Sequence, residues 1–189
     1  MKTLNKFFTA TTLAVALLGA STAWGDPTVV GGNVIVERPV VDGASNFYLV
    51  DTNQPINADG KLDRWEIFAG STLPVQLVIY RQVYGKFYVV GRSKEVTPKQ
   101  KGYNAFKLRP ENKVKAGDFV GAYHPYAGTI SFNFDPPYPP SAFGQGDLTG
   151  TTLFSFDKAN KFSLSSNRRY SIRVMGESND KKPNLEDSQ

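Results

Sequence analysis

The sequence predicts an all-β fold, an antiparallel two-sheet sandwich with a jelly-roll-like arrangement of strands. Two observations carry this prediction: short runs rich in β-branched and aromatic residues, and turn-forming glycines between those runs. Within several runs apolar and polar residues alternate, as expected for an antiparallel sheet with one face in water. The chain has 189 residues, 13% of them aromatic, which is enough to bury the core of one such domain.

Ten strands are expected in one domain spanning residues 26–176, and each is a short run of β-branched or aromatic residues. In chain order they are residues 29–37, 47–50, 64–69, 75–80, 87–92, 104–108, 119–124, 129–134, 152–156 and 170–175. The segment 62–68 also fits a helical spacing, but no long helical pattern occurs elsewhere, which favours a strand. The polar residues 177–189 are expected to form a disordered tail.

Alternation and turn chemistry support individual strands. Val75, Leu77 and Ile79 share one face of their run, and Tyr84-Gly85-Lys86 is expected to join that run to the next as a hairpin. The same two-residue period places further apolar residues on one face of the later runs. Aromatic residues at alternating positions are therefore expected to fill the core: Trp65, Phe68, Phe87, Phe106, Phe119, Phe132, Phe134, Phe154 and Phe156.

The first residues are expected to be a signal peptide rather than part of the fold. Lys2 and Lys6 give a basic start, residues 7–18 form an apolar stretch, and small residues follow. We expect residues 1–23 to be removed, by cleavage after Ala23 or Gly25. The apolar stretch is shorter than the roughly 20 residues that cross a bilayer, so stable membrane insertion is not expected. The protein is therefore predicted to be secreted or periplasmic, and export without cysteine favours a bacterial source.

Composition excludes several chemistries. The chain has no cysteine, which excludes disulfides, thiol catalysis and cysteine-based metal sites. It has one histidine, His124, which lies before a proline and is expected at the surface. Without Lys2 and Lys6, 20 basic residues stand against 17 acidic ones, a net charge of +3. No dense basic run is present, so nucleic acid is not an expected partner.

Part of the chain resembles the extracellular jelly-roll modules of secreted and cell-surface proteins. The resemblance covers residues 59–123 and rests on a Trp-bearing strand after Asp59-Gly60, on VQLVIYRQV and KFYVVGRS, and on VKAGDFVGAY at Val114–Tyr123. Such modules are similar to carbohydrate-binding and adhesion domains, so the resemblance implies recognition rather than catalysis. It assigns no ligand-contacting residue, because its motifs are structural.

An acidic turn at residues 51–63 is a candidate calcium site. Asn57, Asp59, Asp63 and Glu66 follow the spacing of ligands in an EF-hand-like loop, with Gly60 at the position of the tight turn. The first ligand position is occupied by Pro55, which has no side-chain oxygen. The alternative is a plain glycine turn that leads into the strand of Trp65, and in that case no cofactor is needed.

A second candidate site is the proline-rich segment that follows His124. Its rings, Tyr126, Tyr138 and Phe143, can offer flat faces to sugars, and prolines lower the entropy lost on binding. Asp135, Gln145 and Asp147 supply groups for sugar hydroxyls. Long loops of this kind are usually functional. The alternative is a lid that packs its own aromatic rings over the end of the core.

The sequence favours a non-catalytic binding module that recognises a glycan or a cell-surface polymer. No nucleophile elbow, phosphate loop or two-histidine metal motif is present, so the protein is not expected to be an enzyme. Two alternatives stay open. One is a structural, matrix or adhesion subunit with no small ligand, and the other is a glycan-active hydrolase that uses a pair of carboxylates. The oligomeric state does not follow from the sequence.

Overall fold

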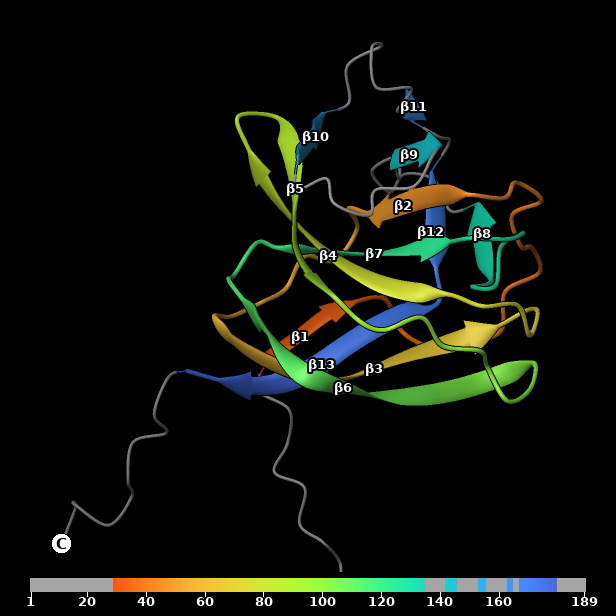
Figure 1. Ribbon diagram of the computed structural model, residues 1–189, viewed down its shortest axis with the longest axis horizontal. Helices are drawn as coiled ribbons and strands as arrows, with labels where there is room; N and C mark the ends of the chain where they lie inside the picture. Colours follow the sequence, from red (N-terminus) through yellow and green to blue (C-terminus); the bar gives the residue numbers. More distant parts are fainter. Residues whose placement is uncertain (1–28, 135–141, 146–152, 156–162, 165–166, 180–189) are drawn as a thin grey trace, which may run out of the picture.

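The chain forms two facing antiparallel β-sheets, as predicted (Figure 1). The computed structural model describes residues 29–134, 142–145, 153–155, 163–164 and 167–179. These residues form thirteen strands and no helix, so the all-β sandwich class is confirmed. Consequently no helix in this part of the chain is long and apolar enough to span a membrane. The expected signal peptide, residues 1–23, lies outside the described residues, and the jelly-roll connectivity stays a prediction.

One sheet has four strands, in the order β1-β13-β3-β6. They are β1 (Val29–Gly32), β13 (Ile172–Ser178), β3 (Gly60–Ala69) and β6 (Gly102–Val114). Strand β13 runs to Ser178, so residues 177 and 178 belong to the sheet and not to the expected tail; residues 180–189 lie outside the described residues. Strand β6 is more than twice the expected length and forms one edge of the sheet.

Strand β3 explains the helix-like spacing of residues 62–68. On β13 the neighbouring residues Met175 and Gly176 pair with Arg64 and Leu62, so Asp63 is an extra residue of β3 in a bulge. Because the bulge adds one residue, Leu62 and Trp65 both point into the core although they lie three positions apart. A bulged strand thus reproduces the spacing of one helical turn.

The second sheet has seven strands, in the order β10-β5-β4-β7-β2-β9-β11. They are β10 (Leu153–Ser155), β5 (Lys86–Arg92), β4 (Gln76–Val83), β7 (Phe119–His124), β2 (Phe47–Asp51), β9 (Ala142–Gln145) and β11 (Ser163–Leu164). The predicted hairpin is confirmed, with Tyr84 and Gly85 between β4 and β5 at φ of 50° and 76°. A small third sheet pairs β12 (Arg168–Tyr170) with β8 (Phe132–Phe134).

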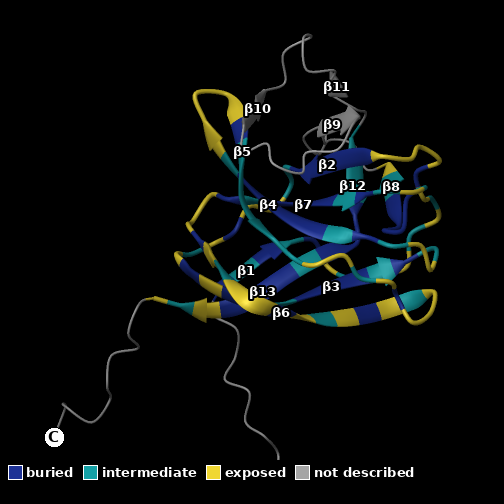
Figure 2. Cartoon of the chain, in the orientation of Figure 1, coloured by how far each residue is buried: buried dark blue, intermediate teal, exposed yellow. Residues whose placement is uncertain are grey.

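The main core lies between the two large sheets, and buried residues, dark blue in Figure 2, occur in strands of both. Trp65, Ile67 and Leu77 are fully buried in it, and Phe132 joins them from β8. Phe134, also expected in the core, is 54% exposed, because β8 leaves the sandwich and pairs with β12. The side chains of the expected core residues Phe154 and Phe156 are not among those described.

The seven-stranded sheet buries apolar residues on both faces. A second cluster, made of Tyr48, Val50, Val78, Tyr80 and Phe87, lies on the face turned away from the main core. Phe87 therefore belongs to this cluster rather than to the expected core. All five residues of β2 are buried, which accounts for its continuous apolar run, since a strand covered on both faces shows no alternation.

Candidate functional site

A groove opens on the outer face of the four-stranded sheet, where β6 leaves its regular register with β3. Leu62 lies opposite Asn112 and Arg64 lies opposite Lys107, so the single residue Asp63 faces a four-residue stretch of β6. Bulges of this kind redirect side chains and are frequent beside functional sites. The cavity has a volume of about 690 Å³ and is lined by Asp63, Arg64 and residues 105–111.

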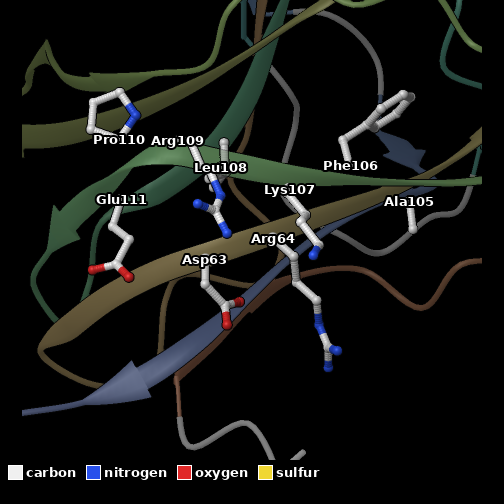
Figure 3. Close-up of a pocket in the computed structure, with 9 residues that line it drawn as sticks. All are labelled: Asp63, Arg64, Ala105, Phe106, Lys107, Leu108, Arg109, Pro110 and Glu111. Carbon is white, nitrogen blue, oxygen red and sulfur yellow. The ribbon is translucent and has the colours of Figure 1, made fainter.

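Charged side chains dominate the open side of this groove. Figure 3 shows Asp63, Arg64, Lys107 and Arg109 projecting from the same side of the two strands, whereas Phe106 points the other way. Phe106 packs against Trp65 of the core, with ring centroids 4.7 Å apart and the rings tilted by 35°, and so anchors β6 to the sandwich. The groove therefore combines nitrogen donors and carboxylate acceptors on two paired strands.

An exposed tyrosine lies on the same face of β6, beside the groove. Tyr103 is 52% exposed and lies on the same side of the strand as Ala105 and Lys107, which follow it at every second position. Its hydroxyl donates to Glu66 Oε1 at 2.8 Å. The pKa of Tyr103 is raised, mainly by burial and next by this hydrogen bond. Arg173 holds Glu66 through two nitrogens, at 3.2 and 2.6 Å from Oε2. This chain of contacts orients the Tyr103 ring.

We call this region the β3–β6 outer surface. It consists of the outward-facing residues of the two strands, Lys61, Asp63, Arg64, Glu66 and Phe68 on β3 and Tyr103, Ala105, Lys107, Arg109, Glu111 and Lys113 on β6. In Figure 2 part of β6 is striped, because its outward residues are exposed and the residues between them are mostly buried or intermediate. The sequence does not predict this surface, since its members become neighbours only when β3 and β6 pair.

The residues predicted for glycan binding are only partly described. Tyr126 is 56% exposed after the end of β7. Phe143 and Gln145 lie in β9, opposite Leu49 and Phe47 of β2, so they belong to a sheet and not to the expected loop. The remaining three predicted residues, Asp135, Tyr138 and Asp147, lie outside the described residues. A glycan site in this segment stays a prediction.

The predicted calcium ligands have other partners. Asn57 Oδ1 accepts the Val30 N–H at 2.8 Å, and Asp59 Oδ1 accepts the Ala116 N–H at 2.8 Å. These two bonds tie the acidic turn to β1 and to the turn before β7. Glu66 is held by Arg173, and Asp63 lines the groove. In the described part of the chain, no three His, Cys, Asp or Glu residues are grouped so that they could hold a metal ion.

His124 is fully buried, which corrects the expected surface position. Its ring stacks on Phe47 with centroids 4.8 Å apart, and its Nδ1 accepts the Thr129 N–H at 3.1 Å. Burial lowers the pKa of His124 to about 3, because the charged imidazolium would be cut off from water. A neutral, enclosed ring of this kind has a packing role.

Two buried carboxylates outside the β3–β6 outer surface, Asp42 and Asp51, also have structural roles. Asp51 accepts hydrogen bonds from Asn33, Asn53 and the Tyr170 N–H, at 2.6 to 3.2 Å. Asp42 binds Arg168 and accepts the Tyr170 hydroxyl at 2.9 Å. Desolvation raises the pKa of both carboxyls. These contacts fasten β12 to β2 and to the segment around Asp42.

Comparison of the chain with family models, with curated proteins and with solved structures finds no match. Function is therefore inferred from the geometry of the β3–β6 outer surface.

Proposed function

We propose that this protein is a non-catalytic binding module that recognises a glycan or another cell-surface polymer on its β3–β6 outer surface. One observation carries the proposal: a groove with both donors and acceptors lies beside a partly exposed, oriented ring, Tyr103. Ligand sites typically combine aromatic area with a few convergent polar groups. Sugars suit such a surface, because their C–H faces stack on rings while their hydroxyls exchange hydrogen bonds with charged groups.

The hydrolase alternative has one supporting feature, since Asp63 and Glu111 line the same groove. A glycosidase needs one carboxyl group kept protonated by an apolar setting, as a general acid. The Glu111 side chain is 53% exposed and lies 3.8 Å from Lys61, which is the opposite setting. The geometry therefore favours binding over hydrolysis.

The structural-subunit alternative depends on an edge strand that can pair with another chain. Strand β6 is such an edge, with 13 residues. However, Pro110 interrupts it, a bulge distorts it, and the exposed Lys107 and Arg109 lie just before Pro110. These are the features by which proteins prevent edge-to-edge association. They favour a surface that binds through side chains.

A glycan array tests the proposal with two matched tyrosine variants. Tyr103→Ala removes the ring of the proposed surface, while Tyr84→Ala removes a 99% exposed ring at the hairpin tip. We expect Tyr103→Ala to lose glycan binding with only a small drop in melting temperature, because Glu66 keeps its ion pair with Arg173, and Tyr84→Ala to bind as the wild type does. If all three proteins bound glycans equally, the binding site would not include Tyr103 of β6. If the wild type bound no glycan, the proposal would be refuted.

A further inference from the structure

The β3–β6 outer surface places like charges directly opposite one another. Lys61 pairs with Lys113, and Arg64 pairs with Lys107, each across the same two antiparallel strands. Residues in direct register point to the same side, and like charges in this position destabilise a sheet. The two pairs lie on either side of the bulge: Arg64 and Lys107 line the groove, and Lys61 and Lys113 line a neighbouring cavity.

The guanidinium of Arg64 has poor partners within the protein. Its Nε is buried with no hydrogen-bond partner in the described residues, and a terminal nitrogen meets only the thioether of Met175 at 3.4 Å. Sulfur of this type is a weak acceptor. Because arginine is suited to bidentate contact with carboxylate, sulfate or phosphate groups, its position in the groove wall points to an anionic ligand.

The acidic residues of the surface leave part of this positive charge unmatched. Glu66 is bound by Arg173, and Glu111 lies 3.8 Å from Lys61. Within the described residues, Arg109 and Lys113 form no ion pair. The excess of positive charge therefore lies along β6.

We infer that the ligand is an anionic polysaccharide that lies along β3 and β6 and is held by the two opposed cation pairs, an inference that rests on the proposed glycan binding. Lys61 and Arg64 are three residues apart, roughly 10 Å along a strand, so the two pairs fit charges repeated along a chain better than one small anion. The carboxylates of Asp63 and Glu111 in the same groove accept sugar hydroxyls. A ligand carrying both anionic groups and hydroxyl donors matches this mixture.

Titration calorimetry of the wild-type protein with three probes tests the inference. The probes are polygalacturonate, neutral dextran, and vesicles containing phosphatidylglycerol. We expect polygalacturonate to bind with an affinity that falls as salt is added. Dextran and the vesicles should bind at least tenfold more weakly, because roughly tenfold is the effect of losing one or two unscreened charge contacts. Equal binding of dextran would overturn the inference while leaving glycan binding intact. Absence of binding to any polysaccharide would overturn both proposals, and vesicle binding of equal strength would overturn the polysaccharide assignment.

A charge reversal at Lys113 gives a second, independent readout. Lys113→Glu places a carboxylate opposite Lys61, so the melting temperature should stay constant or rise, while polygalacturonate affinity should fall roughly three- to tenfold at low salt. Lys86→Glu is the matched control, because Lys86 is exposed on the hairpin and lies opposite Val83. An unchanged affinity of Lys113→Glu, an equal loss in Lys86→Glu, or a lower melting temperature of Lys113→Glu would contradict the role of the cation pairs.

Discussion

Acid should destabilise the protein well before most of its carboxylates titrate, because of His124. The pKa of this ring is about 3 in the folded protein against an ordinary value of 6.5. Between these two values His124 binds a proton in the unfolded chain but not in the folded protein. The contribution of His124 to the free energy of unfolding is therefore fully present above pH 6.5 and is lost as the pH is lowered toward 3. Below pH 6.5, each pH unit lowers the free energy of unfolding by about 1.4 kcal/mol. The loss is therefore about 2 kcal/mol at pH 5 and about 3 kcal/mol at pH 4.

Urea unfolding at pH 7, 6, 5 and 4 measures this loss directly. His124→Asn is the comparison, because its Oδ1 can accept the Thr129 N–H in place of Nδ1 and it does not titrate. This variant should be less stable at pH 7, since it loses the stacking on Phe47, but its stability should fall less steeply with acid. Asp42 and Asp51, with raised pKa values, act in the opposite direction in both proteins and so cancel in the difference. Parallel pH profiles for the two proteins would refute the reasoning.

Two further predictions concern backbone positions, and both are checked by thermal and urea unfolding. Tyr84→Asn should stabilise the protein by about 1 kcal/mol, because Tyr84 has φ of 50° and asparagine adopts this conformation more readily in a hairpin turn. A loss of stability would show that the Tyr84 ring makes a contact that outweighs the cost of its backbone conformation. Gly121→Ala should lower the free energy of unfolding by about 3 kcal/mol, because an added Cβ would lie 2.1 Å from the Leu49 carbonyl oxygen. Gly43→Ala should be nearly neutral, because its added Cβ would have no atom within 4 Å. Similar values for these two variants would contradict the close packing of β2 on β7.

Much of the fold follows from local pattern. Strand β7 begins and ends at the predicted residues 119 and 124, and the turn at Gly85 lies at its predicted position. Strand β6 is longer than predicted, because lysines and a proline hide the continuation of an edge strand whose outer residues face water. Strand β9 is not predicted, since its four residues lie in a proline-rich segment and are recruited by pairing with β2.

The candidate site could not be predicted from the sequence, for a different physical reason. Arg64 and Lys107 are 43 positions apart and become neighbours only through the register of β3 with β6. In the sequence Lys107 is one of several scattered lysines, with no dense basic run to mark it. The burial of His124 escapes prediction likewise, because the sequence shows the proline after it but not the Phe47 ring that covers it.

Hydrogen exchange followed by mass spectrometry, with and without polygalacturonate, tests the proposed binding surface most directly. Ligand held by side chains of β3 and β6 should slow exchange in peptides covering residues 60–69 and 102–114, and leave the hairpin at Tyr84 unchanged. Protection confined to residues 124–147, with β3 and β6 unaffected, would instead locate binding at the proline-rich aromatic segment and would contradict a binding site on the β3–β6 outer surface.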